Sequence, residues 1–243
     1  MTSRAKVAIV IGAGDATGGA IARRFAREGL TAVVVRRTAA ALEPLVAAIE
    51  ADGGRAVAMA TDARDEEAMV ALFDRVEAEI GPITVAVFNI GANVPSPLLA
   101  ETARKYRKIW ELTALAGFLT GREAARVMLP RDTGTILFTG ATASLRGGSG
   151  FAAFAGGKHA LRALAQSMAR EFGPQGIHVA HVVVDGAIDT AFVRDTFPDR
   201  YAAKSDGGIL DPSHIADTYW FLHVQPRDAW THELDLRPWT EKF

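Results

Sequence analysis

The sequence predicts an α/β protein in which a doubly wound parallel sheet carries helices on both faces. Short apolar runs of strand length alternate along the chain with longer stretches of helical periodicity. Most of these runs are apolar at every position, as in strands that are buried inside a parallel sheet. A glycine-rich turn follows the first run, only about ten residues into the chain, and such a turn is typical of the strand-to-helix connection in an open sheet.

Composition limits the classes of function. The chain has 243 residues, 49% of them hydrophobic and 23% charged, as in globular proteins. Its net charge of -1 gives no field for nucleic acid or an anionic membrane, so we expect a small-molecule partner. The sequence has no cysteine, which removes disulfides and thiolate metal sites. Without a recognisable leader or an apolar run near the roughly 20 residues of a membrane span, we expect a cytoplasmic protein.

The first predicted strand covers residues 7–11, and the helix after it begins near Gly18 with Ile21 and Phe25 at helical spacing. Glycines in the turn allow a close backbone approach, and the positive end of the helix attracts anions. The turn therefore predicts a pyrophosphate site, with an ordinary tight turn as the alternative. The candidate residues in it are Gly12, Gly14, Asp15, Thr17 and Gly18.

The second predicted strand, residues 30–35, ends in Arg36 and Arg37. In a doubly wound sheet the end of this strand meets the adenosine ribose, where a carboxylate accepts from a free 2′-hydroxyl and arginine pairs with a 2′-phosphate. No acidic residue stands there, so the pair favours NADP(H) over NAD(H). The alternative is a solvated basic pair at a helix start.

The next elements continue the alternation. Residues 40–51 are predicted to be helical, with Pro44 in the first turn, and residues 56–60 form a strand followed by Asp62. Asp62 could contact adenine or cap the next helix. That helix covers residues 66–80. The strand at 83–88 runs into Asn89 and Gly91.

The second half begins with a long helical region over residues 102–128. A strand at 135–139, a loop of small residues at 140–150, a helix that runs through Lys158 to Phe172 and a strand at 177–184 follow. The positions in the long region that we expect to be buried or at an interface are Tyr106, Ile109, Trp110, Thr113 and Leu115.

After the sixth strand, residues 191–204 are expected to be a mobile segment that covers substrate. A helix over 212–224, a short strand within 231–236 and a tail with Trp239 and Phe243 complete the chain. Ligands of such sheets bind outside the carboxyl ends of the strands. One crevice should therefore collect Gly12, Arg36, Asp62, Asn89, Thr139, Ala141 and Gly186.

With these residues in place, the chain resembles the short-chain dehydrogenase/reductase superfamily over essentially its whole length. The family's T-G-x-x-x-G-x-G turn falls on Ile11, Gly12, Ala16 and Gly18, so two of its positions are replaced. Its N-N-A-G segment falls on residues 88–91, and its P-G pair falls on Asp185 and Gly186, with Thr190 downstream. The resemblance implies one dinucleotide-binding, Rossmann-like domain over residues 1–243. With the strand-end candidates, the cofactor-binding set is Gly12, Gly14, Asp15, Thr17, Gly18, Arg36, Arg37, Asp62, Asn89, Gly91, Lys158, Gly186 and Thr190.

This chain departs further from the catalytic motif of that family than from its cofactor-binding motifs. Lys158 matches the family's lysine, which binds the nicotinamide ribose, although a solvated helix lysine is the alternative. Phe154 stands at the tyrosine position, Ala141 at the serine position and Ala114 at the asparagine position. A phenyl ring has no proton to exchange and an alanine methyl cannot stabilise an alkoxide. The chain therefore resembles an atypical member of the family, one that lacks the catalytic tyrosine and serine.

Hydride transfer can survive this loss, because acid or base catalysis supplies about 3–5 kcal/mol, whereas positioning of the reactants can supply about 7–11 kcal/mol. An iminium or a conjugated alkene would need least help with a proton. The catalytic candidates are Lys158, Thr142 and Ser144. Other groups that could donate a proton are Ser149, Asp185, Asp189 and Tyr201.

Two functions follow from these residues. The first is an atypical NADP(H)-dependent oxidoreductase that transfers hydride to or from a small organic substrate. The alternative is a catalytically silent nucleotide-binding or scaffold protein; non-redox chemistry has no motif of its own. The resemblance also implies a homodimer or homotetramer. No metal site is expected, since His178 and His181 are three apart on a predicted strand and point to opposite faces.

Overall fold

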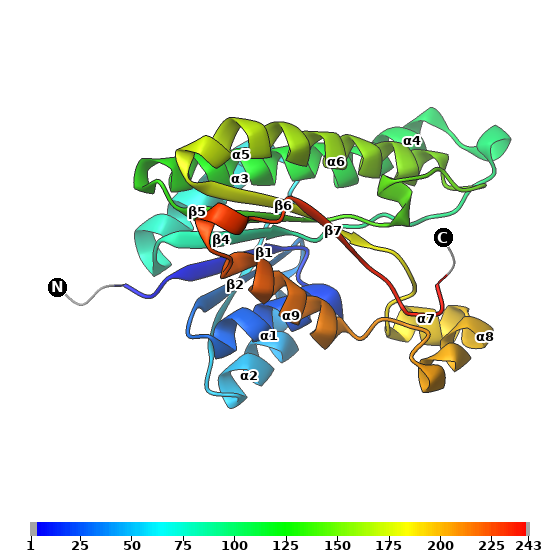
Figure 1. Ribbon diagram of the computed structural model, residues 1–243, viewed down its shortest axis with the longest axis horizontal. Coiled ribbons are helices and arrows are strands. Elements are labelled where there is room, and N and C mark those ends of the chain that lie inside the picture. Colours follow the sequence, from blue (N-terminus) through cyan, green and yellow to red (C-terminus); the bar gives the residue numbers. More distant parts are fainter. Residues whose placement is uncertain (1–3, 242–243) are drawn as a thin grey trace.

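A seven-stranded parallel sheet forms the centre of the computed structural model, which describes residues 4–241 (Figure 1). The strand order is β3-β2-β1-β4-β5-β6-β7, and every neighbouring pair is parallel. The predicted fold class is confirmed; Phe243 of the expected tail lies outside the described residues. The strands are β1 (Val7–Ile11), β2 (Thr31–Arg36), β3 (Arg55–Ala60), β4 (Ile83–Phe88), β5 (Gly134–Thr139), β6 (Ile177–Val184) and β7 (Glu233–Leu236).

The central strands are apolar at nearly every position because both faces of the sheet are covered. In β1, Val7 and Ile9 pack into one hydrophobic core, whereas Ala8 and Val10 pack into the other. Successive side chains of a strand point to opposite faces, so each core takes every second residue. The observed bounds of β1, β4 and β6 are those that the sequence predicts.

Two layers of helices sandwich the sheet. In Figure 1 the helices α3, α5 and α6 lie above the sheet, and α1, α2 and α9 lie below it. Helix α1 shows the periodicity behind this, since Ile21 and Phe25 are both fully buried. The helices are α1 (Thr17–Arg27), α2 (Glu43–Ala51), α3 (Glu66–Arg75), α4 (Ala103–Trp110), α5 (Ala116–Met128), α6 (Ala152–Phe172), α7 (Ala191–Thr196), α8 (Pro198–Tyr201) and α9 (Pro212–His223).

The long helical region of the sequence is interrupted. A π-helical turn, Glu111–Leu115, separates α4 from α5, and a second one, Val76–Ile80, follows α3. Each inserts a wider turn into the helical ladder, which periodicity does not reveal. Residues 39–42 form a 3₁₀ turn, and Pro44 lies in the first turn of α2 as predicted.

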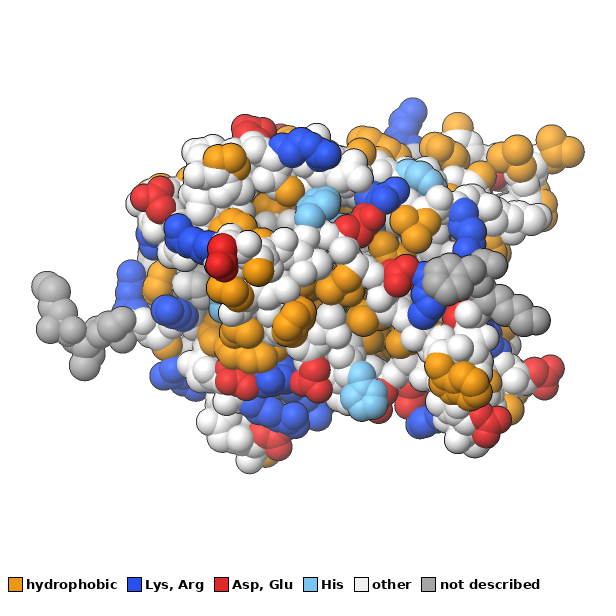
Figure 2. Space-filling model, in the orientation of Figure 1, with side chains coloured by type: hydrophobic (Ala, Val, Ile, Leu, Met, Phe, Trp, Pro, Cys, Tyr) orange, Lys and Arg blue, Asp and Glu red, His pale blue; other side chains and the backbone are white. Residues whose placement is uncertain are grey.

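In α4 and the π-helical turn after it, the positions expected to be buried or at an interface differ in exposure. Ile109 and Thr113 are buried, but Tyr106 and Trp110 are 42% and 41% exposed. Leu98 and Leu99, in the loop that leads to α4, are more exposed still, and Figure 2 shows hydrophobic side chains at the surface at that end of the molecule. These side chains are available to a partner, and an oligomer interface here stays a prediction. No helix within residues 4–241 has the length and apolar character to cross a membrane.

The strand order reverses direction between β1 and β4, and this point positions the site. The Gly12 amide donates to the carbonyl of Val35, and the Asn89 amide donates to the carbonyl of Ile11. Both residues therefore lie at the carboxyl edge of the sheet, where doubly wound proteins bind their ligands. The segment 191–204 forms α7, α8 and the start of a 3₁₀ turn, and Figure 1 places α7 and α8 to one side of the sheet.

Candidate functional site

The turn between β1 and α1 exposes backbone donors. Gly12 has a φ of +91°, which a residue with a Cβ rarely adopts. The first turn of α1 has no side-chain cap and no acidic residue, so its amide N–H groups stay available. Because these groups carry the positive end of the helix dipole, they can bind an anion in the cleft beside Thr17 and Gly18.

A cleft of about 640 Å³ opens above this turn. Its walls come from the glycine turn, the segments after β4, β5 and β6, and the start of α6. At Gly14 and Gly91 an added Cβ would meet no atom within 4 Å, so these glycines leave open space on the cleft wall. Ten of the predicted site residues line the cleft: Gly12, Gly14, Asp15, Thr17, Gly18, Asn89, Gly91, Thr142, Lys158 and Gly186.

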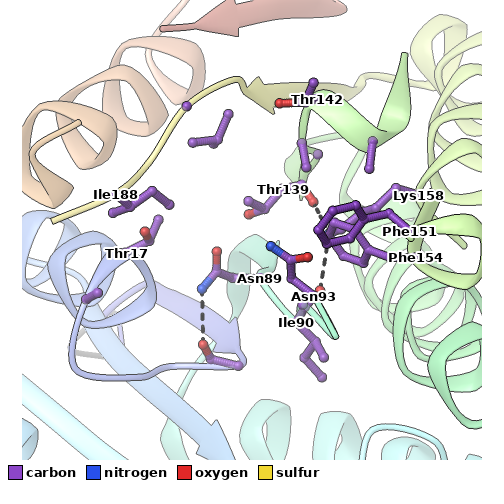
Figure 3. A pocket seen from close by; sticks show the side chains of 18 of the residues that line it. Thr17, Asn89, Ile90, Asn93, Thr139, Thr142, Phe151, Phe154, Lys158 and Ile188 are labelled. Carbon is purple, nitrogen blue, oxygen red and sulfur yellow. Dashed lines mark hydrogen bonds between the residues drawn. The ribbon is translucent and has the colours of Figure 1, made fainter. Parts of the chain in front are cut away.

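Asn89 links the glycine turn to the end of β4. Its Nδ2 donates to the carbonyl of Gly12 over 3.2 Å, the contact drawn at the lower left of Figure 3. The bond leaves the rest of the Asn89 side chain on the cleft wall. It holds the ends of β1 and β4 in one arrangement at the point where the strand order reverses.

Lys158 lies at the other end of the cleft and is only 2% exposed. Its Nζ donates to the carbonyls of Thr139, over 2.7 Å, and Ile90, over 3.2 Å (Figure 3). Removal from water disfavours the charged amine and lowers the pKa of Lys158 to about 7. The solvated-lysine alternative is therefore wrong.

Two aromatic rings stand beside this amine. Phe154 and Phe151 both line the cleft, and Figure 3 shows their rings next to Lys158. The Lys158 Nζ lies 5.8 Å from the centre of the Phe154 ring. Phe154 is thus part of the cleft wall, although its side chain is only 7% exposed.

Thr142 and Ser144 share one 3₁₀ turn after β5 but differ in position. Thr142 lines the cleft, and its hydroxyl donates to the carboxylate of Asp185. Ser144 is fully buried and outside the cleft wall, and its Oγ accepts from the Ala141 amide. The structure corrects the sequence here: Ser144 stabilises the turn and does not reach the cleft.

The strand-end residues lie outside the wall of this cleft. Arg36 is 3.7 Å from Asp15, an exposed pair, and Arg37 is exposed. Asp62 accepts from the Arg64 guanidinium, which holds the pKa of that carboxyl below its usual value. The predicted cap at Asp62 is wrong, because the side chain that caps α3 is Asp65.

After β6, one of the predicted residues lines the cleft and the others do not. Gly186 lines the cleft with a φ of +154°, whereas Thr190 caps α7 by accepting from the Val193 amide. Asp189 forms an ion pair with Lys204 at 2.7 Å, outside the cleft wall. Ser149 and Tyr201 are not on the wall either.

Some residues of the cleft wall were not selected from the sequence. Phe151 stands one helical turn before Phe154, a spacing that could have revealed it. Further residues of this kind lie in loops or in the 191–204 segment and have no such signal. They include Asn93, Arg146, Ile188 and Arg200.

The histidines of β6 have structural contacts. His181 is fully buried with Nδ1 2.9 Å from Glu233, and His178 Nε2 is 2.9 Å from the carbonyl of Thr231. Burial lowers the pKa of His181 to about 4, so the ring is neutral near pH 7. Within the described part of the chain, no three acidic or histidine side chains are grouped as a metal site would need.

A parallel sheet that reverses its strand order beside a glycine turn, with an open cleft above it, defines a fold of the Rossmann-like class. The family model for short chain dehydrogenases matches residues 6–201. The chain belongs to the short-chain dehydrogenase family and is an oxidoreductase of that family.

Individual relatives agree with this membership. The cis-4-hydroxycyclohexanecarboxylate dehydrogenase of Sinomonas cyclohexanicum is 30% identical over 222 residues, with 89% of this chain and 88% of the relative covered. A crystal structure of a short-chain dehydrogenase from Rhodopseudomonas palustris is 49% identical and covers 97% of this chain and 99% of its own, with a TM-score of 0.82. A metagenomic short-chain oxidoreductase in complex with NADP has a TM-score of 0.81 at 24% identity, covering 98% and 99% of the two chains, and shows a likeness of fold alone.

Proposed function

We propose that this chain is an atypical NADP(H)-dependent oxidoreductase that transfers hydride to or from a small organic substrate. The observation that carries the proposal is the cleft itself, in which the open glycine wall and the α1 amides lie at one end and the buried amine of Lys158 at the other. When bound, the nicotinamide would supply or accept the hydride. The pyrophosphate would lie against Gly12, Gly14, Thr17 and Gly18, and Lys158 would meet the nicotinamide ribose.

Three replaced residues support the atypical character. Phe154, Ala141 and Ala114 stand where the family has tyrosine, serine and asparagine. Phe154 and Ala141 line the cleft, so the two replacements lie beside the space for substrate. The same residues favour the second candidate, a catalytically silent dinucleotide-binding protein, which would bind NADPH and never turn it over.

Beside Lys158 the cleft wall is apolar, with Phe151 and Phe154, and the wall also includes Arg146 and Arg200. A small cyclic alcohol or ketone with a carboxylate suits this combination, because the rings offer apolar contact and arginine pairs with carboxylates. A dehydrogenase of cis-4-hydroxycyclohexanecarboxylate is among the relatives. This compound is the first substrate to test.

One experiment separates the two functions. NADPH and NADH are titrated against the protein by fluorescence. Alcohols are then offered with NADP⁺, and ketones, iminium ions and conjugated enones with NADPH. Cofactor binding followed by a change in absorbance at the nicotinamide band supports the oxidoreductase; binding without turnover of any compound supports the silent protein. Absence of NADPH binding contradicts both.

We expect Arg36→Ala to weaken NADPH binding by about 10- to 100-fold and to leave NADH binding unchanged. A charge-assisted hydrogen bond is worth roughly 1.5–3 kcal/mol. Arg36 stands at the end of β2, and its ion-pair partner among residues 4–241 is the exposed Asp15 at 3.7 Å. The dissociation constants are measured by titration at low salt, with the exposed Arg170→Ala as the control. An equal loss for both cofactors argues against a 2′-phosphate contact.

We expect NADPH binding at pH 8 to take up a proton on Lys158. In the free protein burial lowers the pKa of this amine to about 7, and the negative charge of a bound dinucleotide raises it. Affinity should therefore fall as the pH rises above 7. Calorimetric titration in two buffers of different ionisation enthalpy measures the uptake, and Lys158→Met should abolish it. The same proton uptake in both proteins would contradict this assignment.

A further inference from the structure

A buried carboxylate lies directly behind one wall of the cleft. Asp185, the residue after β6, is 2% exposed, and its amide donates to the carbonyl of Leu236 over 2.8 Å. Its Oδ1 accepts the hydrogen bond from the hydroxyl of Thr142, which itself lines the cleft and is labelled at the top of Figure 3. The cleft thus reaches this carboxylate through one hydroxyl group.

The hydrogen bond decides what Thr142 offers to a ligand. A threonine hydroxyl has one proton, and a carboxylate can only accept. The proton of Thr142 is therefore donated to Asp185, and toward the cleft Oγ1 can only accept, through its lone pairs. A group that meets Thr142 must then be a donor, as the hydroxyl of an alcohol is.

Two guanidinium groups stabilise the charge of Asp185. The Nη2 of Arg237 is 3.6 Å from Oδ2, and the Nη2 of Arg146 is 4.0 Å from Oδ1. Arg237 also pairs with Asp235. A buried carboxylate needs such partners, since an isolated buried charge is strongly unfavourable.

The other hydroxyl groups on the cleft wall have different neighbours. Among the described residues the wall includes three threonines, Thr17, Thr139 and Thr142. The Thr139 hydroxyl lies 2.6 Å from the phenol oxygen of Tyr219, which is fully buried. Of the three, Thr142 is the threonine with a hydrogen bond to a carboxylate.

We propose that Thr142 is the catalytic hydroxyl of this enzyme and that Asp185 is the positioning residue that exchanges the proton through it, with an alcohol as the substrate class. The proposal rests on the proposed function. As the alcohol is oxidised, its O–H bond breaks and the proton passes to Thr142 Oγ1, while the Thr142 proton passes to Asp185 Oδ1. The electron pair of the O–H bond forms the carbonyl, and the hydride leaves the adjacent carbon for the oxidised nicotinamide. In the reverse direction the proton returns along the same path.

Matched variants test this pair. Thr142→Val removes the hydroxyl at nearly constant shape, and Thr142→Ser restores it. Asp185→Asn keeps an acceptor for Thr142 but cannot take up the proton. The controls are Asp235→Asn, which also alters a carboxylate paired with Arg237, and Ser167→Ala, which removes an exposed hydroxyl on α6. Thermal unfolding of each variant verifies the fold.

Each variant is assayed with two substrates. The first is the alcohol that the wild type oxidises, starting with cis-4-hydroxycyclohexanecarboxylate. The second is N-methyl-3,4-dihydroisoquinolinium, whose reduction needs no proton. We expect Thr142→Val and Asp185→Asn to lower kcat for the alcohol by about 10²- to 10⁴-fold, with the NADPH dissociation constant and iminium reduction unchanged. Thr142→Ser and the two controls should stay within a few-fold of the wild type.

A measurement without cofactor is independent of turnover. In the apoprotein the Thr142 hydroxyl proton should give a solvent-protected NMR resonance that is lost in Thr142→Val, present in Thr142→Ser and displaced in Asp185→Asn. Alcohol oxidation at the control level in Thr142→Val overturns this proposal and leaves hydride transfer intact, as does an equal fall for both substrates. If the wild type binds NADPH but turns over neither substrate, the proposed function fails, and the proposal fails with it.

Discussion

Replacing Gly18 with alanine should weaken NADPH binding by about 100-fold or more. A Cβ at this position would lie 2.5 Å from the carbonyl oxygen of Gly12 and 2.9 Å from the Nδ2 of Asn89. The first contact is with backbone, which cannot rotate away, so the glycine turn must move. A factor of 100 corresponds to about 2.8 kcal/mol, within the roughly 1–3 kcal/mol of overpacking.

The measurement is an NADPH titration of purified Gly18→Ala beside the wild type. Gly173→Ala is the matched control, because a Cβ at Gly173 meets nothing within 4 Å and its φ is −54°. Circular dichroism shows whether the variant keeps its fold. Affinity within a few-fold of the wild type in a folded Gly18→Ala protein would show that the dinucleotide does not use this turn.

Replacing Gly157 with alanine should lower the free energy of unfolding by about 3 kcal/mol or more. Gly157 in α6 faces the π-helical turn Glu111–Leu115, where a Cβ would come within 1.8 Å of the Thr113 hydroxyl oxygen. Thr113 is fully buried and its hydroxyl donates to the carbonyl of Ile109 over 2.7 Å. The Cβ of Thr113 would also lie only 2.9 Å away, so rotation of the Thr113 side chain does not relieve the clash and α6 must move away from the turn.

Chemical denaturation of Gly157→Ala, Thr113→Ala and the double variant measures the coupling. Thr113→Ala removes the atom that a Cβ at residue 157 would strike, so the double variant should be more stable than the sum of the single losses indicates. Gly173→Ala again controls for a glycine-to-alanine change in the region of α6. Simple additivity of the two losses is the result that contradicts this contact.

This contact also bears on the site. Gly157 is next to Lys158, and Thr113 is next to Ala114, the residue at the family's asparagine position. The close approach of α6 to the π turn therefore sets the position of Lys158 in the cleft. Loss of stability in Gly157→Ala should accordingly be accompanied by weaker cofactor binding.

The strands could be predicted because their signals are local. β1 is a continuous apolar run, and β4 and β6 are apolar except at Thr84, His178 and His181. Each has glycine or proline close to at least one end, and the observed bounds equal the predicted ones. The π turn Glu111–Leu115 carries no such signal, since the residues on both sides of it continue a helical pattern. The position of this π-helical turn depends on how it packs against α6.

The candidate site was predictable where one short motif holds it. Gly12 and Asn89 follow strand ends and Gly18 lies in the first turn of α1, and the structure brings the three to one cleft with Lys158. Side chains with a free choice of partner were not predictable. The Ser144 hydroxyl accepts a hydrogen bond from the Ala141 amide, and the Asp62 carboxylate accepts one from the Arg64 guanidinium. Both donors are within three residues along the chain.

The sequence by itself determined the doubly wound sheet, the glycine turn and the family, since each is indicated by short patterns of residues that are close together along the chain. Only the tertiary structure decided that the Thr142 hydroxyl meets the carboxylate of Asp185, 43 residues away. The physical reason is that β5 and β6 are neighbours in the sheet, so the segments after them end at the same edge, and a pairing between two loops leaves no periodic trace in the sequence.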